Sequence, residues 1–289
     1  MATADVTRLV VLSAIWGASF IFIRVAAPVL GPIWTTEGRL LVGAAALLAW
    51  FRLTRTDARW RHLRFYAFIG VLGTALPFSL FAFAGIHLPA SLMAILNTST
   101  PMLTLAIGAA FGLERMGMAR WLGLLLGAAG VWVLTSPGGG TLRADAMFGW
   151  AVASCLIASL AYALTALAVR QWGKDIPSAG MAVGAQVCGA VAVLPLLAVW
   201  PPAAPPDAIV LGNVAALGLL GSALAYVLFF RLIGDIGATR AQTVSLLVPL
   251  FGVLWSTLFL AEPLTWRLLG SGALIIGGTV LVIRDTAKR

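Results

Sequence analysis

Two polar stretches that interrupt apolar runs hold the residue types best suited to bind a small molecule. They are Asn97-Thr98-Ser99-Thr100-Pro101 and Gln242 to Pro249, and their prolines lie 148 positions apart (249 − 101). Because proline lacks an N–H, the carbonyl groups of Asn97 and Ser245 lose their helical partners. Inside a membrane such groups need a cavity, water or another donor.

We therefore expect both stretches to line a substrate path, with the side chains of Asn97 and Gln242 as hydrogen-bonding groups. The alternative is that serine and threonine side chains bond back to their own helices and that the prolines only kink them. The occurrence of two such stretches at matching depth favours the substrate path.

Aromatic residues near the middle of apolar runs are further candidates. Trp16 and Tyr162 lie 146 positions apart (162 − 16), and each has small neighbours. Aromatic residues of membrane proteins gather at the interfaces, so this depth needs another reason. The rings either form pocket walls or pack between helices with the indole N–H or phenol O–H bonded. Phe20 and Phe78 are weaker candidates, since phenylalanine also fits against lipid, and Tyr226 is the second-half equivalent of Phe78.

Together these features define the expected site. The expected substrate-binding residues are Trp16, Phe20, Phe78, Asn97, Ser99, Pro101, Tyr162, Gln242, Ser245 and Pro249.

Two acids end apolar runs, Glu114 and Glu262, again 148 positions apart (262 − 114). We expect them to form structural ion pairs with basic residues near the membrane interfaces, holding the fourth and fifth spans of each half together. Glycine pairs such as Gly123 and Gly127 in the fifth span, and a glycine cluster from Gly270 to Gly278 in the tenth, predict close helix packing. These two spans would form a static interface or a dimer face.

Catalytic groups are missing from the sequence. It has two histidines, no cluster with metal-ligand spacing and no phosphate-binding loop with Lys-Ser/Thr. We expect no catalytic residue, no metal and no cofactor, so the chain is not an enzyme. None of the ten acids is expected near the middle of a span, which argues against carboxylate-based proton coupling.

The composition places the chain in a membrane. Of its 289 residues 61% are hydrophobic and 10% charged, and the mean hydropathy is +1.01. A soluble protein needs a largely polar surface, whereas a transmembrane helix needs about 20 apolar residues. We predict an all-α integral membrane protein with ten transmembrane helices, at residues 8–27, 33–52, 64–84, 89–112, 119–135, 147–169, 178–200, 210–231, 237–260 and 266–283.

Basic residues in the connections predict the orientation. Of the 19 basic residues, four (Arg24, Arg39, Arg143 and Arg267) fall on the side away from the termini, which leaves 15 (19 − 4) on the side of the termini. The positive-inside rule therefore predicts that both termini are cytoplasmic. This distribution also explains the net charge of +9 without nucleic-acid binding.

An internal repeat divides the chain at the Gly/Pro-rich stretch 136–141. Equivalent residues of the two halves, 1–137 and 138–289, are separated by 146 to 148 positions, as in Gly73-Thr74 and Gly221-Ser222. Five spans per half is an odd number, so the second half enters the membrane from the opposite side. Two inverted five-helix repeats around a central cavity are typical of secondary transporters.

These residues resemble the EamA repeat of the drug/metabolite transporter superfamily, in its ten-helix form. The resemblance rests on Trp16-Gly17-Ala18-Ser19-Phe20, on Pro101 and Pro249, on the two glutamates, and on the glycine-rich fifth and tenth spans. Within the superfamily the chain is most similar to the YddG-type amino-acid exporters. The resemblance implies a central cavity lined by spans 1, 3, 4, 6, 8 and 9, with spans 5 and 10 at the periphery, and efflux of amino acids or related metabolites.

The expected function is export of aromatic or neutral amino acids, or related small metabolites, across the bacterial inner (plasma) membrane by alternating access. The alternatives are efflux of another metabolite or drug, and a passive channel. The expected partners are a small-molecule substrate and the lipid bilayer, with no nucleic acid. We expect a monomer, with a dimer as the alternative.

Overall fold

The computed structural model describes residues 2–54, 59–114, 116–136, 146–237, 241 and 243–286, with side chains for all of these except 135, 146 and 283–286. All regular structure in these ranges is helical, as expected. Within the described residues, six helices are long and apolar enough to cross a membrane, and three shorter helices are also apolar. The protein is therefore a multi-pass membrane protein.

The first helix, α1 (Thr3–Thr54), covers two of the expected spans and is broken at Gly31. Gly31 has φ 75° and ψ 169°, and it lies between Pro28 and Pro32. A positive φ of this size is strained for other residues, and Pro32 cannot donate a helical hydrogen bond. The chain can therefore change direction here between spans 8–27 and 33–52.

Two membrane helices contain a short π-helical segment at equivalent positions. The first consists of α2 (Leu63–Gly70), η2 (Val71–Ala75) and α3 (Leu76–His87); the second consists of α9 (Ala208–Gly218), η4 (Leu219–Leu224) and α10 (Ala225–Ile236). In each, an N–H donates to the carbonyl five residues earlier, from Leu76 to Val71 and from Ala225 to Leu220. Such segments are rare and are frequently found at functional sites.

The polar stretch around Asn97 separates two helices, α4 (Ala90–Asn97) and α5 (Thr100–Ala110). The Thr100 hydroxyl donates to the Asn97 carbonyl at 2.9 Å, and the Ser99 hydroxyl donates to the Leu96 carbonyl at 2.5 Å. Side chains of the same segment therefore satisfy the carbonyl that Pro101 leaves open, as in the kink alternative.

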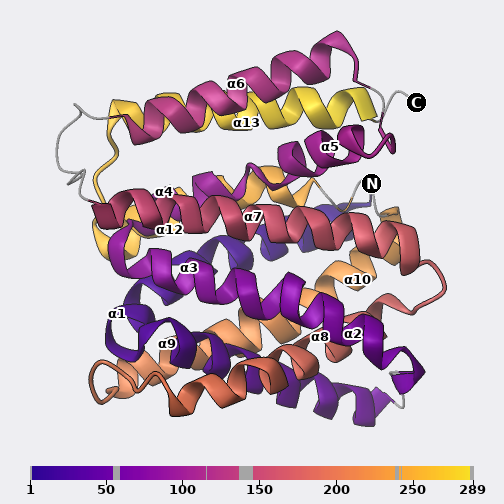
Figure 1. Cartoon of the computed structure of the whole chain (residues 1–289), viewed down its shortest axis with the longest axis vertical. Coiled ribbons are helices and arrows are strands. Elements are labelled where there is room, and N and C mark those ends of the chain that lie inside the picture. Colours follow the sequence, from indigo (N-terminus) through magenta and orange to yellow (C-terminus); the bar gives the residue numbers. More distant parts are fainter. Residues whose placement is uncertain are drawn as a thin grey trace.

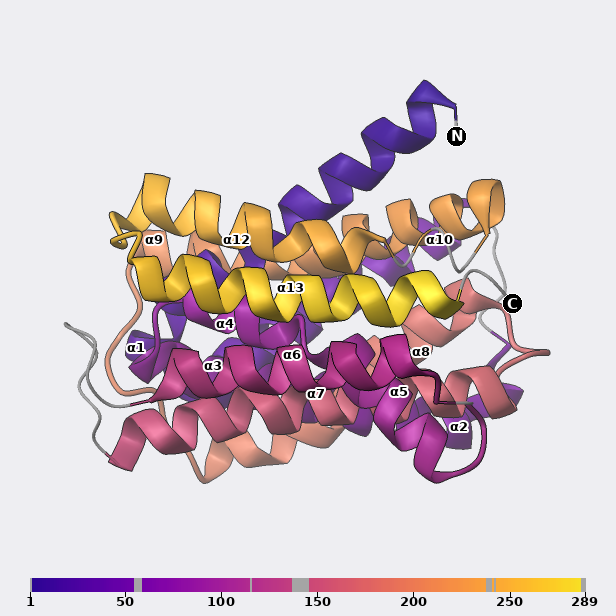
Figure 2. The same cartoon turned by 90° about the horizontal axis from the view of Figure 1, so that it is seen from above.

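The remaining helices complete the bundle of Figure 1. They are α6 (Met118–Thr135), α7 (Ala146–Trp172), α8 (Ser178–Val193) continued by η3 (Leu194–Ala198), α12 (Val244–Leu260) and α13 (Trp266–Thr286). The start of α1 and the end of α13 lie at the same end of the bundle in both views (Figures 1 and 2).

Helices α6 and α13 pack side by side at one edge of the molecule (Figure 1). A Cβ added at Gly123 would lie 2.7 Å from the Gly278 carbonyl oxygen, and one added at Gly130 would lie 2.9 Å from that of Ser271. The glycines thus allow backbone to approach backbone. The close packing expected from the glycines of spans 119–135 and 266–283 is confirmed.

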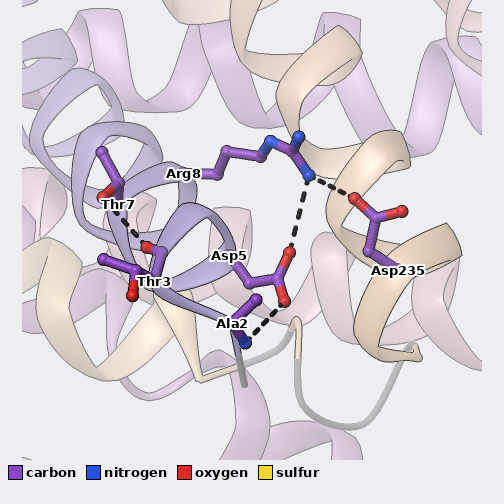
Figure 3. A network of polar contacts seen from close by, with 6 residues as sticks. All are labelled: Ala2, Thr3, Asp5, Thr7, Arg8 and Asp235. Carbon is purple, nitrogen blue, oxygen red and sulfur yellow. Dashed lines mark hydrogen bonds and ion pairs between the residues drawn. The ribbon is translucent and has the colours of Figure 1, made fainter.

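Charged residues at the end of the bundle that holds the termini tie α1 to α10 (Figure 3). The Arg8 guanidinium contacts the carboxylates of Asp235 and Asp5, the latter at 3.5 Å, and the Asp5 carboxylate also accepts a hydrogen bond from the backbone N–H of Ala2. The contact between Arg8 and Asp235 joins the start of α1 to the end of α10.

Candidate functional site

Trp16 contacts the π-helical segment η4. Its indole N–H donates to the carbonyl of Gly221 at 3.2 Å, and its ring lies 5.3 Å from that of Phe229 in α10. A Cβ at Gly221 would lie 2.7 Å from the Ser19 hydroxyl, so α1 and η4 approach closely here. Trp16 is half-buried, so part of the ring remains accessible beside η4.

Phe20 and Tyr162 belong to one row of rings formed by α1, α3 and α7. Phe20 meets Phe81 edge-on with ring centroids 5.6 Å apart, and Phe81 stacks on Tyr162 at 6.3 Å. Phe20 and Phe81 are buried, whereas Tyr162 is half-buried. No hydrogen bond joins the Tyr162 hydroxyl to any residue that the structure describes.

A buried cation, Arg39, also contacts η4; it was expected in a connection on the side of the membrane away from the termini. Arg39 lies in the second half of α1 and is only 8% exposed. Its Nε donates to the Ser222 hydroxyl at 3.1 Å, a terminal nitrogen donates to the Gly221 carbonyl at 3.4 Å, and its Cζ lies 3.6 Å from the centroid of the Phe78 ring. The signal was in the sequence, because position 39 lies inside the predicted span 33–52.

Two further polar residues in the membrane helices were missed. Glu37 is 1% exposed, and neither carboxylate oxygen bonds any residue in the described ranges. Gln186 in α8 is 0% exposed, and its amide is likewise unpartnered among those residues. Glu37 lies near the start of the expected span 33–52, six residues beyond the Gly31 break, and its burial within α1 was not anticipated.

The proline stretches lie elsewhere in the bundle. The Thr98 carbonyl accepts a hydrogen bond from Thr279 in α13 at 3.2 Å, so the break between α4 and α5 packs towards the α6–α13 edge. Asn97 is half-buried, and its buried side-chain oxygen has no hydrogen-bond partner in the described part of the chain. No hydrogen bond or ring contact between described residues joins Asn97 to the aromatic group.

The other expected residues of these stretches are placed as follows. Ser99 is buried, Pro101 lies in the first turn of α5, Ser245 is half-buried and Pro249 is buried inside α12. Gln242 lies outside the described residues.

The two glutamates make different contacts. Glu114 forms ion pairs, with Arg120 at 3.3 Å and with Arg170 at the end of α7. Glu262 instead accepts hydrogen bonds from the backbone N–H groups of Ala90 (2.7 Å) and Ser91 (3.0 Å) and from the Ser91 hydroxyl (2.6 Å). Glu262 therefore caps the start of α4, where a carboxylate also faces the positive end of the helix dipole. Among the described residues Glu262 forms no ion pair.

Glu114 predicts a pH effect on stability. The hydrogen bond from Arg170, followed by the charges of Arg170 and Arg120, holds the pKa of the Glu114 carboxyl below its usual range. A lowered folded-state pKa contributes stability above the ordinary glutamate value and loses it as the pH falls through the folded-state pKa. Glu114→Gln should therefore lower thermal stability at neutral pH and flatten its decline in acid.

The test is a series of melting temperatures of the detergent-purified protein from neutral to acidic pH. Arg170→Gln should reduce the loss of melting temperature in acid in the same way, because it removes the main cause of the lowered Glu114 pKa. If the melting temperature of Glu114→Gln falls as steeply in acid as that of the wild type, Glu114 does not stabilise the protein in this way. The effect should be small, since the Arg170 side chain is 60% exposed.

The sequence profile of the EamA-like transporter family, a family of the drug/metabolite transporter superfamily, matches the chain twice, over residues 6–136 and 149–284. The chain belongs to the EamA-like transporter family. The resemblance seen in the sequence is thereby confirmed. Members of the family are transporters, so this EamA-like protein is not an enzyme, and no group of three metal-ligating side chains occurs in the described ranges.

Relatives of this EamA-like protein share its length. An "Uncharacterized transporter" of Archaeoglobus fulgidus is 22% identical over 93% of this chain and 95% of its own. A "Probable terminal-alkyne amino-acid exporter" of Streptantibioticus cattleyicolor is 27% identical, over 98% of this chain and 95% of its own. The "Uncharacterized inner membrane transporter YedA" of Escherichia coli K12 is 27% identical, over 94% of this chain and 88% of its own.

A solved structure has the same fold. It is described only as the crystal structure of a protein, and it superposes with a TM-score of 0.68 at 18% identity, over 100% of this chain and 99% of that one. At this identity the likeness concerns the fold alone.

Proposed function

We propose that this EamA-like protein is a secondary transporter that exports aromatic or neutral amino acids, or related small metabolites, across the bacterial inner membrane. The observation that carries the proposal is the half-buried aromatic group of Trp16 and Tyr162 beside the buried cation of Arg39. Rings and a cation together suit a solute that has an apolar side chain and a carboxylate. The relative named as an amino-acid exporter supports the same substrate class.

The proposed mechanism is alternating access by two inverted repeats of five helices, residues 1–137 and 138–289, with both termini cytoplasmic. Recurring contacts support it. A Cβ at Gly70 would lie 3.0 Å from the Cβ of Cys188, and one at Gly218 would lie 2.5 Å from the Cβ of Val42. Gly70 and Gly218 are equivalent residues of the two halves, 148 positions apart, and so are Val42 and Cys188, 146 positions apart. Each half therefore packs on the other through the same pair of surfaces. Exchange of conformation between such halves opens the site to each side in turn.

The experiment is counterflow in liposomes that contain the purified full-length protein. We expect saturable exchange of radiolabelled amino acids that unlabelled substrate competes away. Absence of exchange across the twenty amino acids refutes the proposed substrate, and flux that does not saturate indicates the passive channel.

The second candidate is efflux of another small metabolite or drug. Glu37 favours it, because a buried carboxylate without a partner in the described ranges could bind an organic cation. The same liposomes distinguish the two candidates, since a cationic drug but no amino acid would then compete.

The polar stretch around Asn97 is proposed as part of the substrate path. Because the Asn97 side-chain oxygen bonds no described residue, Asn97→Ala should preserve folding and reduce transport by about tenfold, as expected for one lost hydrogen bond. Counterflow rates at equal amounts of folded protein measure the effect.

Thr104→Val is the matched control, because the Thr104 hydroxyl is satisfied by the Thr100 carbonyl of its own helix at 2.9 Å. It should transport normally. Gln242→Ala tests the second stretch. Normal transport by both the Asn97 and Gln242 variants would leave the stretches as kinks only.

A further inference from the structure

Arg39 is a membrane-embedded cation whose hydrogen bonds and ring contact within the described part of the chain are all with electrically neutral groups. Its contacts are the Ser222 hydroxyl, the Gly221 carbonyl and the Phe78 ring, and no carboxylate of the described residues lies within ion-pair distance of it. A charge placed at such depth is costly and normally pairs with an opposite charge or marks a binding site. Arg39 therefore lacks a resident counter-ion in this part of the chain.

Glu37 is close in sequence but does not fill this role. It lies two residues before Arg39 in α1, about 200° around a helix with 3.6 residues per turn. The two side chains thus leave the helix on opposite sides. Neither Glu37 oxygen makes a hydrogen bond to a described residue, Arg39 included.

Two tyrosine hydroxyl groups lie near the guanidinium. The hydroxyl groups of Tyr162 in α7 and Tyr226 in α10 are near enough to interact with Arg39 electrostatically. Both tyrosines are half-buried, and neither hydroxyl is hydrogen-bonded to another residue in the described ranges. Two phenol O–H groups therefore remain available beside the cation.

Gln186 lies beside the same face of α1. Gly43 follows Arg39 by four residues, one turn along that face. A Cβ at Gly43 would lie 3.0 Å from the Cβ of Ser222 and 3.5 Å from the side-chain oxygen of Gln186. The fully buried Gln186 amide, unpartnered among the described residues, is thus next to the hydroxyl that holds Arg39.

The Arg39 guanidinium can donate further hydrogen bonds. Its Nε is held by Ser222 at 3.1 Å, but the bond to the Gly221 carbonyl is long, 3.4 Å, and the Gly221 carbonyl also accepts from Trp16. The edge formed by the two terminal nitrogens can therefore turn to an incoming ligand. Two parallel N–H groups match the two oxygens of a carboxylate.

We propose that Arg39 binds the carboxylate of the transported solute, with Tyr162, Tyr226 and Gln186 as additional donors and with Ser222 and Phe78 positioning the guanidinium. The ligand class is a monocarboxylate with an aromatic or apolar side chain, which Trp16 would contact. This inference rests on the proposed function and adds the group of the substrate that is recognised.

The test is competition in counterflow with radiolabelled phenylalanine. In the wild type, phenylalaninamide, which lacks the carboxylate, should compete about tenfold or more weakly than phenylalanine. In Arg39→Gln this difference should fall below about threefold. Arg24→Gln is the matched control on the same helix, because Arg24 bonds the Gly85 and Ile86 carbonyls, away from this site. It should keep the wild-type ratio.

A second measurement reads the site without transport. We expect 3-phenylpropionate to raise the melting temperature of the detergent-purified wild type, and phenethylamine to leave it unchanged. Arg39→Gln should abolish the stabilisation by 3-phenylpropionate. If Arg39→Gln does not fold, Arg39→Lys retains the charge without the planar fork and should give an intermediate ratio.

The outcomes separate the two proposals. The carboxylate site is overturned, and amino-acid export stands, if amino acids are exchanged but phenylalanine and phenylalaninamide compete equally well. The same conclusion follows if the difference in competition between them is unchanged in Arg39→Gln. Stabilisation by 3-phenylpropionate that depends on Arg39, without exchange of any amino acid, keeps the site and overturns amino-acid export. Absence of both acid preference and stabilisation overturns the site.

Discussion

Gly17→Val should prevent stable folding of the full-length protein. A Cβ at Gly17 would lie 2.7 Å from the Cβ of Phe251 and 2.8 Å from the backbone nitrogen of Gly252. Backbone atoms cannot move aside as a flexible side chain can, so α1 and α12 must separate. Overpacking of this kind costs about 1–3 kcal/mol or more, and Gly252 is itself closely packed against Ala94 of α4.

The measurement is the melting temperature and the recovered monodisperse fraction in detergent. Gly149→Val is the matched control, because it adds the same β-branched side chain to α7 where no atom lies within 4 Å of the new Cβ. It should behave as the wild type. Equal losses in both variants would show that valine in a helix, and not the α1–α12 contact, is responsible.

Gly278→Ala should destabilise the α6–α13 edge, whereas Gly277→Ala should not. The Cβ of residue 278 would lie 2.5 Å from the Gly123 carbonyl oxygen and 3.0 Å from the Gly127 nitrogen, and the Cβ of residue 277 would meet nothing within 4 Å. We expect a loss of about 1–3 kcal/mol at position 278, and a neutral or slightly favourable change at position 277.

Thermal melting of the two single variants side by side checks this prediction. Both positions lie in α13 and both changes add one methyl group, so helix propensity and hydrophobicity cancel in the comparison. A lower melting temperature for Gly277→Ala than for Gly278→Ala contradicts the packing of α13 on α6.

The helical fold could be predicted because it depends on composition and hydrophobic length. The expected spans 89–112 and 119–135 compare with helices that run from Ala90 to Ala110 and from Met118 to Thr135. The break at Gly31 was also anticipated as a connection, although helical geometry continues on both sides of it. Local signals of this kind require no knowledge of tertiary contacts.

The site was harder to predict because it depends on which side chains meet. Arg39 follows a proline-containing break and was counted with the connections, but the helix continues past it and buries it against Ser222 and Phe78. The role of Glu262 could not be read from the chain either, since its partners Ala90 and Ser91 lie about 170 positions away. Sequence alone does not place one helix end over another.

The π-helical segments have a consequence for residue register. Each takes up about one residue more than an α-helical turn of similar rise and rotation, so the extra residue is absorbed locally and the residues that follow keep the directions they would have in a regular helix one residue shorter. Deleting a single residue between Leu219 and Leu224 would therefore let α9 and α10 join as a regular α-helix and leave Tyr226 near Arg39. Such a deletion would leave the helix content and the mean hydropathy almost unchanged. Alignments that close this one-residue gap would therefore pair side chains that face different neighbours.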